Sequence, residues 1–213
     1  MMIAANATIL VIDSVSAACS AALLDAEGGL IAERHEITGR GHAERLIPMI
    51  AELLDDRVPS AVLVDCGPGS FTGLRVGLAA AQGLAIGWRI PVSGYSAPAL
   101  LAAMARAGSA PVAAALHGGH GELFVQVFAG DPLEPIDSLR SLPPEEAARA
   151  VTADLVVGSG AEALVAARGH GEARDLLPRA ADAFLLPPAL RTLPARPIYG
   201  RAPDARPMSG ASQ

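Results

Sequence analysis

Short apolar segments separated by glycine turns and amphipathic stretches set the pattern of the chain. Residues 8–13 (TILVID), 18–25 (ACSAALLD) and 30–37 follow one another through tight turns and predict three strands of an antiparallel meander. A helix is predicted over residues 42–55, because apolar side chains recur there at helical spacing: Leu46, Ile47, Met49, Ile50, Leu53 and Leu54. Residues 61–66 (AVLVDC) are apolar up to Asp65, as expected for a strand in a sheet covered on both faces.

The order of elements then repeats along the chain. A glycine-rich turn precedes a predicted helix that ends near Trp88, followed by a strand at 90–93 and a helix at 96–106. In the second half we predict strands at 111–116, 122–129, 133–139 and 155–158, and helices at 144–150 and 161–168. This repetition predicts a duplicated α/β fold with two lobes, each a mixed sheet with flanking helices, the second lobe being reduced.

Three regions follow from this pattern. Residues 1–107 form the predicted N-terminal lobe and residues 108–186 the reduced second lobe, with the boundary near Gly108. Residues 187–213 carry recurring prolines, which predict an extended surface segment that is loosely ordered after about Arg206.

The composition argues against some classes of function. Hydrophobic residues make up 51% of the 213 residues and aromatic residues only 3%, so the core must be built mainly from small aliphatic side chains. All 16 basic residues are arginine, and a phosphate loop of the Walker type requires a lysine. The net charge of −6 argues against binding of nucleic acid by this chain alone, because neutralisation of phosphates drives such binding.

The sequence predicts a cytoplasmic protein without a membrane segment. No basic residue precedes Arg34, so a signal peptide is not expected at the N-terminus. The longest charge-free stretch, residues 90–105, is broken by Pro91 and Pro98 and is too short to cross a bilayer. Cys19 and Cys66 match no metal-binding or redox spacing and are expected to be buried thiols in a reducing compartment.

The segment GPGSFTG at residues 67–73 lies between a predicted strand and a predicted helix. Its amide groups and the helix N-terminus suit an anion, with possible anion or nucleotide contacts from Asp13, Gly69, Ser70 and Thr72. The alternative is a tight packing turn with Ser70 or Thr72 as the helix cap, and with Asp13 as a turn residue. Its spacing differs from that of a dinucleotide-binding fingerprint.

The helix after this turn contains Gly77, Gly83 and Gly87, each of which costs about 1 kcal/mol relative to alanine. Its small residues form two rows: Gly73, Gly77, Ala81 and Ala85 in one, and Ala79, Gly83 and Gly87 in the other. Either row permits a close approach by a neighbouring element. One interpretation is packing on the chain's own sheet, and the other is an interface with a second subunit.

Other polar residues suggest no reaction centre. His117 and His120 are three residues apart in a glycine-rich turn, without an obvious third ligand, so no metal site is expected. Ser96 precedes Pro98, which suits a capped helix rather than a hydrolase nucleophile turn. His42 with Glu44 is expected to provide polar capping at the start of a helix.

Four segments resemble the bacterial TsaB (YeaZ) family. They are ILVIDSVSAACSAALL at 9–24, HAERLIPMI at 42–50, GPGSFTGLRVGLAAAQGLA at 67–85 with IPVSGYSAPALLA at 90–102, and PIYGRAPDARP at 197–207. The resemblance implies the duplicated actin-like ATPase (ASKHA) fold. It also implies a non-catalytic, cofactor-free subunit that pairs with a TsaD-like paralogue, which transfers a threonylcarbamoyl group to N6 of the adenosine beside the tRNA anticodon.

Further partners implied by the resemblance are a TsaE-like ATPase and tRNA, the latter only through the complex. The implied pairing surface lies on the two helices at 42–55 and 71–88, and we assign to it Leu46, Met49, Ile50, Leu53, Leu74, Gly77, Leu78, Ala81 and Ala85. When the chain is alone, a homodimer through the same surface is a further expectation.

The sequence departs from the family pattern at two places. The opening Asp13-Ser14-Val15 replaces the usual Asp-Thr-Ser, and His117-Gly118-Gly119 replaces a segment that tends to read Asp-Ala-Arg. Two other functions remain alternatives: an actin-like ATP-dependent kinase that uses Asp13 and the glycine turn, and a metallopeptidase of the glycoprotease-like group.

Overall fold

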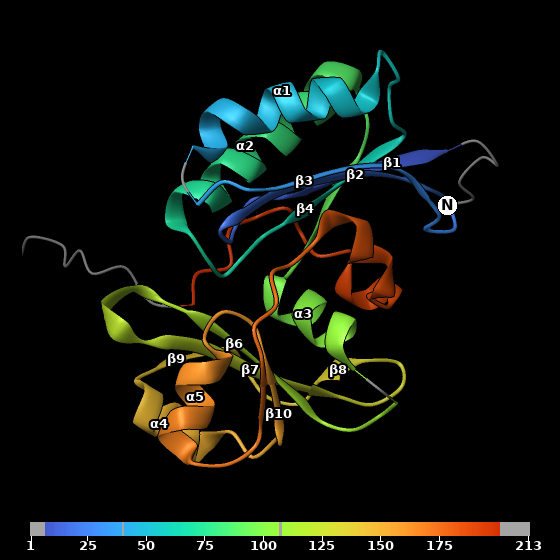
Figure 1. Cartoon of the computed structure of the whole chain (residues 1–213). Coiled ribbons are helices and arrows are strands. Elements are labelled where there is room, and N and C mark those ends of the chain that lie inside the picture. Colours follow the sequence, from blue (N-terminus) through green and yellow to red (C-terminus); the bar gives the residue numbers. More distant parts are fainter. Residues whose placement is uncertain (1–6, 40, 107, 201–213) are drawn as a thin grey trace, which may run out of the picture.

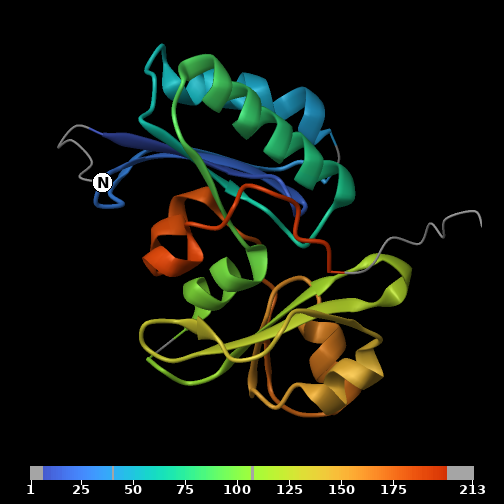
Figure 2. The same cartoon turned by 180° about the vertical axis from the view of Figure 1, so that it is seen from behind.

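A computed structural model describes residues 7–39, 41–106 and 108–200 of the chain. Its elements form successive layers (Figure 1). Helices α1 and α2 cover one face of a first sheet, and α3 lies between this sheet and a second one. Helices α4 and α5 cover the outer face of the second sheet, as the reverse view also shows (Figure 2).

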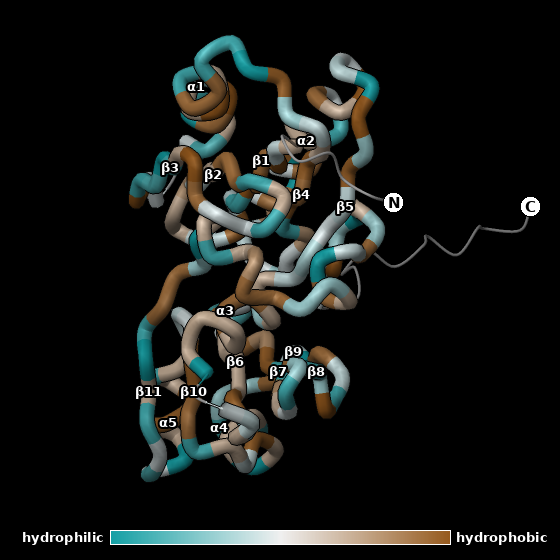
Figure 3. The backbone as a smooth tube through the Cα atoms, turned by 90° about the vertical axis from the view of Figure 1, so that its right-hand side faces the viewer, coloured by the Kyte–Doolittle hydropathy of each residue, from teal (hydrophilic) through white to brown (hydrophobic). Residues whose placement is uncertain are grey.

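The first sheet has the strand order β3-β2-β1-β4-β5. Its strands are β1 (Thr8–Asp13), β2 (Ala18–Asp25), β3 (Leu30–Ile37), β4 (Ala61–Asp65) and β5 (Val92–Tyr95). The first three pair antiparallel, and β4 and β5 lie parallel to β1. The predicted meander is therefore confirmed. Strands β1 and β4 are largely brown in the hydropathy view, as expected for strands covered on both faces (Figure 3).

The helices of the first half are α1 (His42–Leu54), α2 (Phe71–Trp88) and α3 (Ala97–Ala105), close to the predicted ranges. Ser70 caps α2 by accepting a hydrogen bond from the Gly73 amide at 3.2 Å. Ser96 caps α3 in the same way through the Ala99 amide. Both predicted serine caps are thus confirmed.

The second sheet has the order β11-β10-β6-β7-β8, and β9 pairs with β7. Its strands are β6 (Val112–His117), β7 (Leu123–Ala129), β8 (Glu134–Pro135), β9 (Arg140–Leu142), β10 (Leu155–Val157) and β11 (Glu172–Arg174). The outer helices are α4 (Pro144–Ala150) and α5 (Ala161–Arg168). Three 3₁₀ turns complete the described elements: η1 (Gly119–Gly121), η2 (Ala180–Leu185) and η3 (Pro188–Leu190).

The predicted strand at 133–139 is wrong in its extent. Within this range only Glu134–Pro135 (β8) is a strand, and β9 begins after it at Arg140. The chain bends between them at Asp137, whose carboxylate accepts a hydrogen bond from the Val127 amide at 2.7 Å. The same carboxylate also pairs with Arg140 at 2.7 Å. These side-chain contacts hold the chain in a turn where hydrophobicity alone favours a strand.

The main hydrophobic core joins the two sheets. It includes buried residues of the first sheet, all three N-terminal helices, and the inner side of β6 and β7. Helix α3 precedes the second sheet in sequence but packs against β6, β7 and β10. A second cluster lies between the other face of this sheet and α4 and α5. The division at residues 107 and 186 stays a prediction.

After the 3₁₀ turn η3, the described part of the C-terminal segment runs along the edge of the first sheet. Leu193 forms an antiparallel bridge with Gly94 on β5. Further along, the Ile198 amide donates to the Cys66 carbonyl at 2.7 Å, and the Gln82 side chain donates to the Ala195 carbonyl at 3.0 Å. Residues 201–213, including the region after Arg206, lie outside the described residues.

Candidate functional site

The glycine-rich turn after β4 is held by contacts within the chain. The amide of Gly67 donates to the Asp65 carboxylate at 2.7 Å, and the amide of Ser70 donates to the Val15 carbonyl at 2.7 Å. A side chain at Gly69 would meet the Val15 carbonyl, and one at Gly73 would meet the carbonyl of Ser14. The glycines thus permit close packing of this turn on the β1–β2 turn.

The four predicted anion contacts do not share one open surface. The Asp13 side chain is fully buried, and its Oδ2 accepts a hydrogen bond from the Tyr95 hydroxyl at 2.9 Å. Ser70 acts as the cap of α2, and Thr72 is exposed on its first turn. This geometry favours the packing interpretation, and an anion or nucleotide contact by Asp13, Gly69, Ser70 and Thr72 stays a prediction.

The nine residues assigned to the partner surface lie inside this chain. Each is buried against the first sheet or between α1 and α2: Leu46, Met49, Ile50, Leu53, Leu74, Gly77, Leu78, Ala81 and Ala85. Their apolar spacing marks the inward faces of both helices. The assignment of these side chains to a partner surface is therefore corrected, because they are already covered by the fold.

The same helices present a different set of small and apolar residues to solvent. On α1 these are Ala43, Ile47 and Ala51, and on α2 they are Phe71, Ala79, Gly83, Ile86 and Gly87. We call this set the outer α1–α2 face. Its large side chains are strongly exposed: Ile47 at 50%, Phe71 at 58% and Ile86 at 78%. Figure 1 shows the two helices side by side on the outside of the first sheet.

The two glycine rows of α2 differ in what surrounds them. A side chain at Gly77 would lie 2.5 Å from the Ser14 hydroxyl, so Gly77 is required by internal packing. At Gly83 and Gly87 an added Cβ meets nothing within 4 Å. The row that faces inward is the one with Gly73 and Gly77, and the outward row has no packing role among the described residues.

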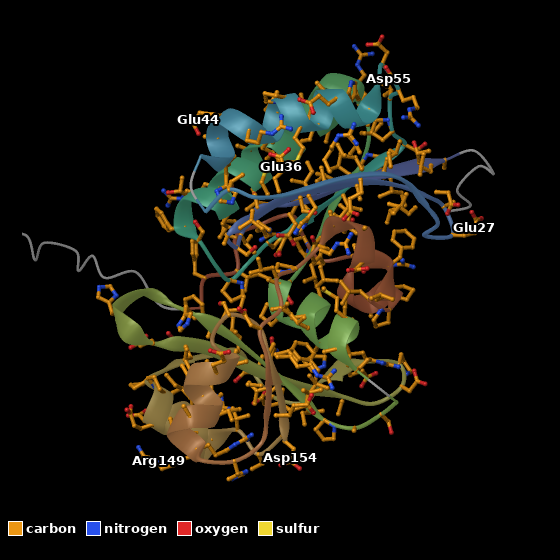
Figure 4. The ribbon with its side chains drawn as sticks, in the orientation of Figure 1. Glu27, Glu36, Glu44, Asp55, Arg149 and Asp154 are labelled. Atoms are coloured by element: carbon orange, nitrogen blue, oxygen red, sulfur yellow. The ribbon has the colours of Figure 1, made fainter. Side chains whose placement is uncertain are left out.

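A charged cluster links α1 to the neighbouring strand β3. Arg45 donates to the Glu36 carboxylate of β3 at 2.6 and 2.8 Å, and to Glu52 at 2.9 Å. These hydrogen bonds lower the pKa of both glutamates. Glu36 is labelled beneath α1 in Figure 4, where the strand and the helix meet. The bidentate Arg45–Glu36 contact adds a directional polar link to the apolar packing of α1 on the sheet.

One histidine makes a contact inside the fold. His42 is buried, and its Nε2 lies 3.2 Å from the Ala18 carbonyl; Gly41 stands at the N-cap, so the predicted capping role of His42 is wrong. Within residues 7–39, 41–106 and 108–200 no three His, Cys, Asp or Glu side chains gather in an arrangement suited to a metal ion.

None of the described helices is both long and apolar enough to cross a membrane.

Comparison with solved structures identifies the fold class of the chain. A crystal structure of an uncharacterized Pseudomonas aeruginosa protein, described as similar to the peptidase YeaZ, superimposes with a TM-score of 0.75. The two chains are 30% identical, and the match covers 92% of this chain and 100% of the other. A structure of YeaZ from the same species gives a TM-score of 0.74 at 28% identity over 91% of this chain and 99% of the other. The fold is the duplicated actin-like α/β fold.

Sequence comparison gives the family. A family model described as "TsaD: tRNA N6-adenosine threonylcarbamoyltransferase" matches residues 18–135. The protein of Escherichia coli named tRNA threonylcarbamoyladenosine biosynthesis protein TsaB is 35% identical over 130 residues, 58% of this chain and 55% of that protein. The Haemophilus influenzae protein of the same name is 44% identical over 41% of this chain and 38% of its own length. The chain belongs to the TsaB (YeaZ) family, and it spans about half or less of these two curated relatives.

Proposed function

We propose that this chain is a non-catalytic partner subunit in the biosynthesis of tRNA threonylcarbamoyladenosine. In this proposal it docks through the outer α1–α2 face against a TsaD-like paralogue and activates that subunit. The observation that carries the proposal is the exposed Gly83 and Gly87 row beside Ile86, on a helix whose other face already packs on the sheet.

The energetics of α2 support a partner at this face. Each of the outward glycines lowers helix stability by about 1 kcal/mol relative to alanine, and nothing described within the chain offsets this loss at Gly83 or Gly87. Glycines without neighbours allow a second backbone to approach closely, which increases dispersion contacts. Burial of Ile47, Phe71 and Ile86 would then add the hydrophobic contribution, at about 25 cal/mol per Å².

The proposed non-catalytic role is supported by the environment of the carboxyl groups at the ends of β1 and β4. Asp13 and Asp65, the carboxylates that end these strands, are enclosed within the fold, and one oxygen of each accepts a hydrogen bond from the chain itself. The net charge of −6 supports a model in which tRNA is bound by the complex and not by this subunit alone. A TsaE-like ATPase is the proposed third component.

Reconstitution of threonylcarbamoyl transfer to tRNA tests the proposed function. The chain alone is expected to have no transfer activity, and the TsaD-like subunit is expected to require it for full activity. Gly83→Arg should abolish this activation, whereas Glu27→Gln, in the exposed β2–β3 turn far from α1 and α2 (Figure 4), should retain it. Full activity of the TsaD-like subunit without this chain would contradict the proposal.

In the absence of the paralogue, the same face is expected to pair two copies of the chain. A specific interface buries about 1,200–2,000 Å² in total, and an unpaired face of this kind favours self-association. Addition of the paralogue should then replace the homodimer, which sedimentation of the mixed and separate proteins would show.

A further inference from the structure

A row of polar side chains crosses the first sheet from edge to edge on its inner face. Ser20 on β2 pairs with both Asp13 on β1 and His35 on β3. Strands β1 and β4 pair in register up to the residues directly before Asp13 and Asp65, so these two aspartates are neighbours across the strands. Asp65 in turn pairs with Tyr95 on β5. The Ser20 hydroxyl accepts a hydrogen bond from the Ala180 amide of η2 at 3.1 Å, which places the row on the face opposite α1 and α2.

At the centre of this row two carboxyl groups are enclosed together. The exposed fraction is 0% for Asp13 and 1% for Asp65. One oxygen of each has a donor: Tyr95 Oη for Asp13 Oδ2 at 2.9 Å, and the Gly67 amide for Asp65 Oδ1 at 2.7 Å. The other oxygens, Asp13 Oδ1 and Asp65 Oδ2, are buried and have no hydrogen-bond partner of good geometry within the described part of the chain. The backbone groups of Val15 and Ala97 lie close enough to Asp13 and Asp65, respectively, to lower the pKa of each, but less than burial raises it.

Two ionised carboxylates cannot satisfy these oxygens, because both groups then only accept hydrogen bonds. Two buried charges of the same sign also repel each other strongly. A single proton removes both difficulties, since a protonated carboxyl donates to the other one and the pair keeps one negative charge. We propose that Asp13 and Asp65 share one proton in the folded protein at neutral pH, so that the two strands are joined by a carboxylic acid–carboxylate hydrogen bond.

The charges around the pair support this assignment. Burial, and then the charge of Asp13, raise the pKa of Asp65 well above its usual range, and burial also raises the pKa of Asp13. The Tyr95 hydroxyl stays protonated as the donor, because burial raises its pKa well above the usual range. The other titratable or charged groups near the pair and the elements packed on it are Cys19, Glu33, His35, Cys66, Arg179 and Asp182. Helix α3 contributes no titratable side chain between Ala97 and Ala105.

Asp13 and Asp65 lie at the start of the two loops that contact the first turn of α2. Asp13 precedes Ser14, whose hydroxyl donates to the Gly73 carbonyl at 2.8 Å. Asp65 binds the Gly67 amide at the start of the glycine-rich turn. Removal of the shared proton places two negative charges at this junction, so the attachment of α2 to the sheet becomes weaker as the pair ionises.

The expected pH dependence follows from the raised pKa. The folded state holds the proton at a pH where an unfolded aspartate, with a pKa of about 4, has lost it. The contribution of the pair is therefore complete below that value and is lost as the pH rises. The unfolding constant should increase roughly tenfold per pH unit between the unfolded and the folded pKa, and level off above the latter.

Unfolding by urea across about pH 5 to pH 9 tests the proposal on the full chain, with Asp65→Asn and Asp13→Asn as variants. Each asparagine donates permanently to the remaining carboxylate and keeps the charge of the protonated pair. Both variants should therefore remove the pH-dependent loss of stability seen in the natural chain. Glu27→Gln, which removes one exposed carboxylate, should leave that loss unchanged.

Infrared spectroscopy of the folded proteins provides a readout that does not depend on unfolding. The natural chain at neutral pH should show the C=O stretch of a buried carboxylic acid, and both asparagine variants should lack it. If one of the two variants does not fold, comparison of the spectrum of the natural chain with that of the other variant still tests whether the acid band belongs to the Asp13–Asp65 pair. Absence of the acid band from the natural chain at neutral pH would overturn the proposal. So would equal pH dependence of the natural chain and Asp65→Asn.

Discussion

The hydroxyl of Ser14 donates a hydrogen bond of 2.8 Å to the carbonyl oxygen of Gly73, 59 residues further along the chain. This contact, together with the close approach of Gly77 to the same serine, fixes the rotation of α2 about its axis. One small-residue row is thereby turned towards the sheet. The other row, with Gly83 and Gly87, is turned to solvent beside α1.

Alanine substitutions in the two glycine rows should have opposite effects on the free energy of unfolding. Gly77→Ala places a methyl group 2.5 Å from the Ser14 hydroxyl, and we expect a loss of about 1–3 kcal/mol in the free energy of unfolding. Gly83→Ala meets open space and should gain about 1 kcal/mol from helix propensity. Urea unfolding of the two variants measures both effects. A destabilised Gly83→Ala or a stabilised Gly77→Ala would contradict the orientation of α2.

Both cysteines should be unreactive in the folded protein. Burial raises the pKa of Cys19 to about 11 and that of Cys66 to about 12, so neither supplies much of the nucleophilic thiolate near neutral pH. A thiol-specific reagent such as dithionitrobenzoate should label neither residue in the native state and both after unfolding in urea. Rapid labelling of native protein would show that one of these thiols is open to solvent.

Removal of the C-terminal segment should expose one cysteine and not the other. The Cys66 carbonyl binds the Ile198 amide at 2.7 Å, and its sulfur lies 3.7 Å from the Pro194 carbonyl. Truncation before Leu193 is therefore expected to make Cys66 reactive towards the same reagent and to lower stability. Cys19, buried on β2, serves as the internal control and should stay protected. Unchanged protection of Cys66 would mean that the segment does not cover it.

Much of the fold was predictable because hydrophobic periodicity determines it locally. The apolar strands of the first sheet and the spacing of Leu46, Met49 and Leu53 gave the correct elements. The short elements were not predictable in the same way. The turn at Asp137 depends on a contact with the Val127 amide, and β11 spans only Glu172–Arg174, too few residues for a periodic signal.

The candidate surface was predictable as a pair of helices but not as a set of residues. Apolar spacing identifies the face that a helix buries, and for Leu78 and Ala81 that face packs on the chain's own sheet. The glycines of the two rows are distinguished by their contact with Ser14, which is distant in sequence. The Asp13–Asp65 pair likewise required the register of β1 and β4, which sequence alone leaves open.

The most direct test of the account is the affinity of this chain for a TsaD-like subunit, measured by titration calorimetry with Gly83→Leu and Gly77→Ala beside the natural protein. A leucine at Gly83 prevents close approach of the partner without disturbing the fold, so Kd should rise by about 100-fold or more, a loss of several kcal/mol. Circular dichroism of Gly83→Leu should match that of the natural chain. Gly77→Ala, if it folds, should bind nearly as well as the natural protein. Unchanged affinity of a folded Gly83→Leu would contradict docking through the outer α1–α2 face.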